Sequence, residues 1–145
     1  KTILLKKKHS VYICNIMAKK KTRSQVVKKL DAAFSEYIRR RYAKNDIAEC
    51  VTCGKQDHWK RLQAGHFQSR KHYSTRWDET NVQVQCSGCN VFRWGEQYKF
   101  SKWLDSNKGE GTSEMLAEKA REIVKFTTKD LEEMTQKYKD LSKEF

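Results

Sequence analysis

The sequence lacks any apolar run long enough to cross a bilayer, although the chain has 145 residues. Its early stretch ILLKKKHSVYICNIM is interrupted by lysines, which also excludes a secretory signal. Hydrophobic residues make up only 37% of the chain and charged residues 34%. Proline and internal repeats are absent, and the lack of repeats excludes a solenoid. We therefore expect a cytoplasmic protein with no membrane partner. We also expect a small core that needs additional stabilisation.

Acidic residues are absent from the first 30 positions, which carry ten Lys or Arg. The whole chain has a net charge of +13, and the last 45 residues contribute almost nothing to this excess. One-sided basic charge is typical of a nucleic-acid partner, whereas the alternative is a solvated basic tail. We interpret residues 1–24 as a flexible basic extension and residues 25–145 as a single domain. Residues 1–16 resemble a leader before MAKKK, and Cys14 is expected to be a free thiol.

Apolar periodicity predicts helices at both ends of this domain and short strands between them. A helical stripe starts at Gln25 with Ser24 as its N-cap, and its arginine-rich end suits a helix C-terminus or a phosphate backbone. RLQAGHF (61–67) and NVQVQC (81–86) are strand candidates, the second with clear alternation. Helical spacing then returns in three stretches: residues 91–105, 113–126 and 128–145.

Four of the five cysteines form two Cys-x-x-Cys pairs, which predict a structural zinc site. Two such pairs supply four thiolates, and four thiolates complete a tetrahedral zinc site of the treble-clef type. Two disulfides are the competing interpretation, but a reducing cytoplasm disfavours them. A redox motif needs only one pair. The predicted zinc ligands are Cys50, Cys53, Cys86 and Cys89.

The 32 residues between the two pairs contain a candidate catalytic histidine. Hydrolysis of a phosphodiester needs a base, a divalent cation and a group that orients the base. His66 ends the first strand and can accept a proton near neutral pH. Asn90 follows the last zinc cysteine and offers a carbonyl oxygen to Mg²⁺ or Mn²⁺. Asn81 opens the second strand and could orient the His66 ring across the hairpin.

These three residues resemble the signature of the HNH, or ββα-metal, nucleases. An Asn directly after a zinc Cys-x-x-Cys is similar to the endonuclease VII group of phage resolvases. More closely, CVTCGK, LQAGHFQSR and TRWDETNVQVQCSGCNVF resemble the phage lambda NinG family, also called Rap, over roughly residues 26–141. This resemblance implies an α+β fold with a zinc-stapled ββα-metal centre flanked by helices. It also implies a metal-dependent endonuclease in the host cytoplasm that acts on branched recombination DNA, such as Holliday junctions or D-loops.

One position departs from the HNH pattern. Many HNH enzymes carry a metal-binding Asp immediately before the catalytic histidine, whereas this chain has Gly65. Asp78 and Glu79 are the nearest acidic candidates for the second metal ligand, His72 is a further candidate, and water could take the place instead. An Asp introduced at residue 65 would then be expected to strengthen metal binding unless Asp78 already fills that place.

The flanking residues suggest how DNA could be held. Phosphate contacts are expected from four basic residues beside the motif: Arg70, Lys71, Arg76 and Arg93. Trp59, Trp77 and Trp94 are candidates for stacking on bases, although core packing is the simpler interpretation for at least two of them. The apolar stripe of the last helix could form a homodimer interface. A non-catalytic zinc-dependent DNA-binding module explains the charge and the cysteines equally well, but it does not explain the His-Asn-Asn set.

Overall fold

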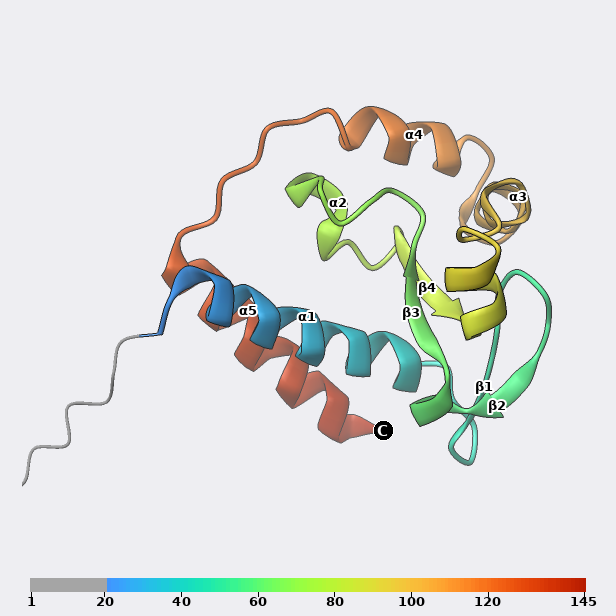
Figure 1. Ribbon diagram of the computed structural model, residues 1–145, viewed down its shortest axis with the longest axis horizontal. Coiled ribbons are helices and arrows are strands. Elements are labelled where there is room, and N and C mark those ends of the chain that lie inside the picture. The colour runs from blue at the N-terminus through green and yellow to red at the C-terminus, as the bar shows by residue number, and fades with distance from the viewer. Residues whose placement is uncertain (1–20) are drawn as a thin grey trace, which may run out of the picture.

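The computed structural model describes residues 21–145 as a mixed α+β fold (Figure 1). The expected leader, Cys14 and most of the basic extension lie outside the described residues. In chain order the elements are α1 (Arg23–Arg40), β1 (Ile47–Glu49), β2 (Gln56–His58), β3 (Gln63–His66), α2 (Tyr73–Arg76), β4 (Val82–Gln85), α3 (Gln97–Lys108), α4 (Thr112–Lys119) and α5 (Thr128–Leu141). Short helical turns occupy Trp59–Arg61, Gly88–Phe92 and Ser142–Glu144. No helix among residues 21–145 is long and apolar enough to cross a membrane.

Helix α1 begins two residues earlier than the apolar stripe predicts. Its N-cap is Thr22, not Ser24, because Thr22 and Gln25 form a reciprocal capping box. The hydroxyl of Thr22 accepts from the Gln25 amide, and the Gln25 side chain accepts from the Thr22 amide. The predicted stripe is otherwise confirmed, since Leu30, Phe34 and their apolar neighbours in the helix are buried.

Two antiparallel strand pairs lie beside α1. Strands β1 and β2 form one pair, and the two predicted strands form the other as β3 and β4. In the second pair Gln63 lies opposite Gln85 and His66 lies opposite Val82. Because side chains alternate along a strand, one face of this hairpin carries glutamines and the other carries Ala64 and the valines. The valine face packs into the core with α1.

Helix α5 covers α1 along its length, and Figure 1 shows the two lying side by side. The predicted apolar stripe of α5 is directed inward, with Leu131 fully buried and Tyr138 nearly so. The Tyr138 ring meets Phe34 edge-on at 4.7 Å between centroids. The stripe that was expected to form a dimer interface is therefore already occupied within the chain.

Two predicted helices are shorter than expected. The stretch 91–105 is divided, because residues 94–96 adopt left-handed backbone between the turn at Gly88–Phe92 and the start of α3. The stretch 113–126 ends its helix at Lys119, since beyond the buried Ala120 the side chain of Ile123 finds no partner and is 90% exposed. Helices α3 and α4 pack together around a second small core of Phe100, Leu104 and Leu116.

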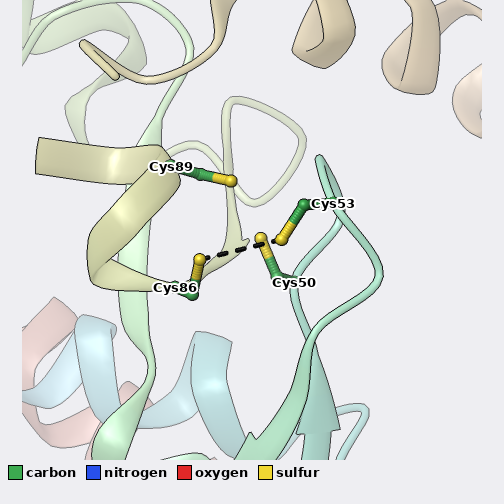
Figure 2. Close-up of side chains that lie close together, drawn as sticks. All are labelled: Cys50, Cys53, Cys86 and Cys89. Carbon is green, nitrogen blue, oxygen red and sulfur yellow. Dashed lines mark hydrogen bonds between the residues drawn. The ribbon is translucent and has the colours of Figure 1, made fainter. Parts of the chain in front are cut away.

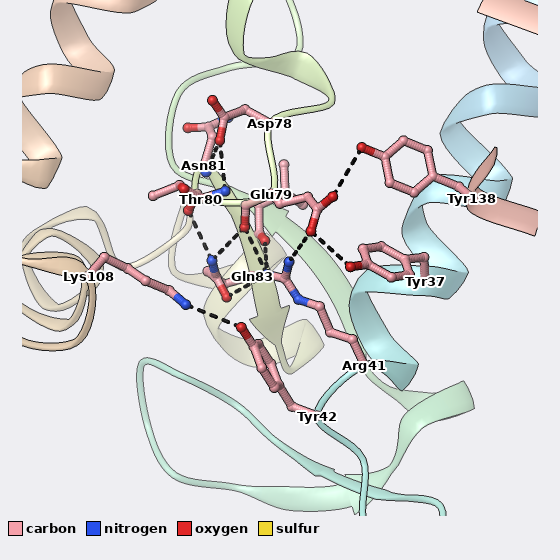
Figure 3. Close-up of polar contacts among 11 residues, drawn as sticks. Tyr37, Arg41, Tyr42, Asp78, Glu79, Thr80, Asn81, Gln83, Lys108 and Tyr138 are labelled. Carbon is pink, nitrogen blue, oxygen red and sulfur yellow. Dashed lines mark hydrogen bonds and ion pairs between the residues drawn. The ribbon is translucent and has the colours of Figure 1, made fainter. Parts of the chain in front are cut away.

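The end of α1 is fixed to the start of β4 by a polar network (Figure 3). The side chain of Arg41 is only 7% exposed and pairs with Glu79 at 3.2 Å. It also donates to the Gln83 side chain at 3.1 Å, while Glu79 accepts from Tyr37 at 2.8 Å. This arginine was expected to suit either the helix end or a phosphate backbone, and the structure uses it inside the fold.

Removal of the Leu131 side chain tests the packing of α5 on α1. We expect Leu131→Ala to lower the free energy of unfolding by about 2–5 kcal/mol, because a fully buried leucine leaves a cavity when truncated. Ile123→Ala is the matched control and should change it by less than about 0.5 kcal/mol, since that side chain is exposed. Denaturant unfolding followed by circular dichroism measures both, and equal effects would contradict the packing described.

Candidate functional site

Four cysteines from two distant turns meet at one point (Figure 2). Cys50 and Cys53 follow β1, and Cys86 and Cys89 follow β4. Their sulfur atoms all lie within 4.8 Å of one another, and the sulfurs of Cys53 and Cys86 are 3.7 Å apart. Zn–S bonds of about 2.3 Å in a tetrahedron place sulfurs about 3.8 Å apart, whereas a disulfide joins them at about 2.0 Å. The cluster therefore fits zinc and is not a pair of disulfides.

The electrostatics of this cluster also favour a cation. Burial opposes ionisation of Cys50, but hydrogen bonds from Thr52 and from backbone groups outweigh it and lower the pKa of the thiol to about 6. Burial and the neighbouring sulfurs raise the pKa of Cys53. Without a cation the four sulfurs therefore cannot all ionise easily, and a zinc ion supplies the charge that permits it.

Arg93 lies against this cluster. Its guanidinium donates to the sulfur of Cys89 at 2.9 Å and also pairs with Glu96. From its sequence position, Arg93 was expected to contact a phosphate. In the structure its donors contact the sulfur of Cys89 and the carboxylate of Glu96. The contact with the sulfur holds the Cys89 side chain in place from outside the cluster, as groups beside metal ligands commonly do.

His66 is held at the far end of the β3–β4 hairpin from the cysteines. Its Nε2 atom lies 2.9 Å from the carbonyl oxygen of Arg76. A carbonyl only accepts, so Nε2 carries the proton and Nδ1 keeps the lone pair that a base needs. Burial and the positive charge of Arg70 lower the pKa of His66 to about 4, so the imidazole is neutral at pH 7. The arrangement is that of a fixed neutral imidazole with one basic nitrogen.

Asn81 does not orient the His66 ring directly. It is fully buried, and its Nδ2 donates to the carbonyls of Gln68 and Thr75 at 3.0 and 2.9 Å. Its Oδ1 accepts from the Gln68 amide at 2.7 Å. Asn81 therefore fixes the loop between β3 and β4. One of its partners, Thr75, directly precedes Arg76, whose carbonyl holds His66. The expected direct contact is replaced by an indirect one through the backbone.

Asp78, the expected second metal ligand, is occupied within the fold. One carboxylate oxygen accepts from the amides of Thr80 and Asn81 at 2.7 and 3.2 Å, and the other pairs with Lys119 at 2.6 Å. Burial opposes ionisation, but Lys119 and the two amides outweigh it and lower the pKa of Asp78. These contacts cap the turn before β4 and engage both carboxylate oxygens of Asp78 inside the fold. Glu79 is likewise bound in the network around Arg41.

Asn90 is positioned by the cysteine cluster and by β3. Its backbone amide donates to the carbonyl of Cys86 at 2.9 Å, and its side-chain Nδ2 donates to Gln63 at 2.7 Å. The contact with Gln63 engages the side-chain nitrogen of Asn90 and does not involve its side-chain oxygen. Gln63 lies three residues before His66, about 10 Å along a strand. Within residues 21–145 His66 and Asn90 share no hydrogen bond, so each is fixed to a different position of the same hairpin.

The space that an acidic side chain at residue 65, directly before His66, would occupy is already filled. A Cβ atom on Gly65 would lie 2.0 Å from the Oε1 atom of Gln85. Gln85 is fully buried, and its Nε2 donates to Thr52 and to the carbonyl of Gly95. Its Oε1 has no hydrogen-bond partner within the described part of the chain. Substitution of Gly65 by Asp would therefore have to displace Gln85, a contact that no local sequence pattern predicts.

The other basic residues of the predicted site divide into two groups. Arg70 and Lys71 are exposed, as DNA contacts require. Arg76 instead forms a bidentate ion pair with Asp31 of α1, at 3.0 and 2.7 Å. It donates as well to the carbonyl of Arg70 at 2.9 Å. Asp31 was missed from the sequence because its partner lies 45 positions away, and no local pattern connects the two.

Loss of one cysteine tests the zinc assignment. We expect Cys89→Ser to lose its bound zinc and to unfold or aggregate, because in a small domain the free energy of metal binding is also free energy of folding. Metal analysis after dialysis and thermal unfolding measure the two effects. Cys14→Ser is the control and should keep the zinc, since the other four cysteines already supply four ligands. A Cys89→Ser protein with full zinc content and unchanged thermal stability would contradict the four-cysteine site.

Comparison with known proteins gives a single result. No curated protein and no solved structure matches the chain. Residues 6–145 match the model of the family described as Bacteriophage Lambda NinG protein. The match extends over the cysteine cluster, the hairpin and all the helices described above, and it confirms the resemblance to the NinG family noted from the sequence. The chain therefore belongs to the bacteriophage lambda NinG protein family.

Proposed function

We propose that this protein is a metal-dependent DNA endonuclease with a structural zinc centre. The observation that carries the proposal is the state of His66, which is held through Nε2 by the carbonyl of Arg76 and kept neutral by burial. A neutral imidazole whose tautomer is fixed can take a proton at its second ring nitrogen, as a general base does.

In this mechanism Nδ1 of His66 takes the proton from the attacking water. The exposed Arg70 contributes positive charge near His66 and would attract the phosphate. Asn90 would offer its side-chain oxygen to Mg²⁺ or Mn²⁺, which stabilises the charge of the leaving oxygen when bound. The Gln63 contact and the neighbouring Cys89 hold Asn90 in place. Zinc has no part in the chemistry and serves to position Asn90.

The resemblance to ββα-metal nucleases supports the same assignment. The hairpin formed by β3 and β4 leads through the cysteine turn to a short helical segment, in the order that those nucleases use. Asn81 supports the loop that carries the carbonyl partner of His66. The Gln85 oxygen fills the space where the usual acid would begin, and Gln85 is fully buried, so in this proposal water supplies the second metal ligand. The substrate class we propose is branched recombination DNA, and the basic charge of the chain suits any DNA.

Substitution of His66 tests the proposal. His66→Ala should cut DNA roughly 10²–10⁴-fold more slowly, the range typical for loss of a positioned base. It should retain its zinc and its affinity for DNA, because neither the cysteines nor the exposed basic residues change. Single-turnover cleavage of a four-way junction with added Mg²⁺ measures the rate, with binding measured separately in the absence of Mg²⁺.

Two controls make this test specific. His58→Ala should cut at nearly the wild-type rate, since that imidazole accepts from the Lys60 amide and caps a helical turn. Asn90→Ala should recover part of its deficit at high Mg²⁺ or Mn²⁺, because it weakens metal binding and leaves the base in place. Cleavage by His66→Ala at the wild-type rate would exclude the mechanism. If the wild-type protein binds DNA but never cuts it, the chain is a zinc-dependent binding module.

The low pKa of His66 predicts an unusual pH profile. A base is active when unprotonated, so a pKa lowered to about 4 keeps His66 active well below pH 6.5. We expect kcat/KM, which reports the free enzyme, to fall only below about pH 5. A bound phosphate offsets the charge of Arg70 and raises the pKa of His66, so the acidic limb of kcat should lie at higher pH. The pH profiles of kcat and kcat/KM, both measured at saturating zinc, test this prediction. Acidic limbs of the two profiles that coincide near pH 6.5 would contradict it.

A further inference from the structure

Three aromatic side chains are strongly exposed directly after the cysteine cluster. Phe92 is 77% exposed, Trp94 87% and Tyr98 75%. The other two tryptophans considered from the sequence, Trp59 and Trp77, are buried, as the simpler interpretation expected. Exposed aromatic groups gathered in one short stretch are unusual in a small domain and commonly mark a binding surface. We call residues 92–98 the aromatic tip.

The backbone holds Trp94 outward and does not leave it free to fold back. Trp94, Gly95 and Glu96 have φ values of 53°, 83° and 49°, a left-handed run that L side chains rarely adopt. The buried Gly95 fixes this run at its centre. Its amide donates to the carbonyl of Cys89 at 2.8 Å, and its carbonyl accepts from Gln85 at 2.9 Å. The aromatic tip is therefore tied to the zinc cluster and to β4.

The charges around the aromatic tip indicate the chemistry of its partner. Arg93 and Lys99 both pair with Glu96, and Arg93 also donates to the sulfur of Cys89. The ammonium group of Lys102 lies 5.6 Å from the centre of the Tyr98 ring and places a cation beside the rings. A surface of exposed rings with a cation beside it fits a partner that presents flat aromatic faces joined by anions. Unpaired nucleobases on a phosphate backbone have this chemistry.

We infer that the aromatic tip stacks on unpaired nucleobases, with Trp94 as the main platform. Stacking needs a base that has left the duplex, so the tip favours single-stranded and branched DNA over intact duplex. Asn90 belongs to the same turn after β4, so a base bound at the tip lies at the Asn90 end of the hairpin, opposite the end that carries His66. The inference rests on the proposed function for its biological setting, since it gives the nuclease its preference for branched substrates.

Substitution of Trp94 tests the inference by binding alone. The probes are a labelled oligo(dT), a duplex, and a four-way junction, each measured by fluorescence anisotropy without added Mg²⁺ so that no cleavage occurs. Trp94→Ala should bind oligo(dT) and the junction roughly 10- to 100-fold more weakly, the range expected for loss of one to two stacked bases. Duplex affinity should stay within about 2-fold, because phosphate contacts supply it.

Two further variants serve as controls. Trp94→Phe keeps an aromatic face and should retain most of the affinity for oligo(dT). Ile123→Ala removes an equally exposed apolar side chain, 90% exposed, far from the zinc cluster in the sequence, and should change nothing. Zinc content and thermal stability should match the wild type in all three proteins, since neither side chain is buried.

The outcomes separate this inference from the proposed function. Unchanged binding of oligo(dT) and junction by Trp94→Ala overturns the inference, even if the wild-type protein cuts DNA. A wild-type dimer that becomes monomeric in Trp94→Ala, with DNA affinity unchanged, also overturns it and assigns the tip to a second copy of the chain. Selective loss of oligo(dT) binding supports it even if no cleavage is ever observed, because the assay contains no catalytic metal.

Discussion

The four cysteines join two turns that lie far apart in the sequence, and the other parts of the structure depend on this connection. The apolar content is low, and the core is divided into a larger part around α1 and a smaller part between α3 and α4. Three of the four clustered cysteines belong to the larger part, and the cluster connects the β1–β2 pair to the end of β4. Around it, the Val51 amide donates to the Val84 carbonyl, and Gln85 donates to Thr52. The two strand pairs, which share no ladder, therefore keep a fixed relation, and both Asn90 and the aromatic tip take their positions from it.

Local patterns in the sequence were sufficient for the parts of the fold that repeat or pair at short range. Apolar periodicity identified α1 and α5, because their buried faces follow the helical period. The alternation of valine and glutamine identified β4, although all four of its residues are buried. The spacing of the cysteines was sufficient to predict their cluster, whose geometry fits zinc. Helix ends were less predictable: the capping box at Thr22 and the left-handed run at residues 94–96 each depend on a few individual hydrogen bonds.

The roles of the polar residues could not be read from the sequence, because each depends on a distant partner. Asp78 was expected at a metal, but Lys119 reaches it from α4. Arg76 was expected on a phosphate, but Asp31 binds it from α1. Asn81 supports a loop, and Gln85 occupies the space that Gly65 leaves. The net charge counts buried arginines such as Arg41 together with exposed ones, so it overstates how much positive surface is available to DNA.

The packing of α5 on α1 has a consequence for how the molecule is made. The two helices lie near opposite ends of the described chain, whereas all four cysteines and the hairpin lie between them. Contacts between distant segments close long loops and slow folding, while contacts within the middle segment close shorter ones. A nascent chain on the ribosome therefore exposes all four clustered cysteines before α5 emerges to cover the apolar face of α1. Until then that face is open to other chains, so rapid completion of synthesis protects the protein from aggregation.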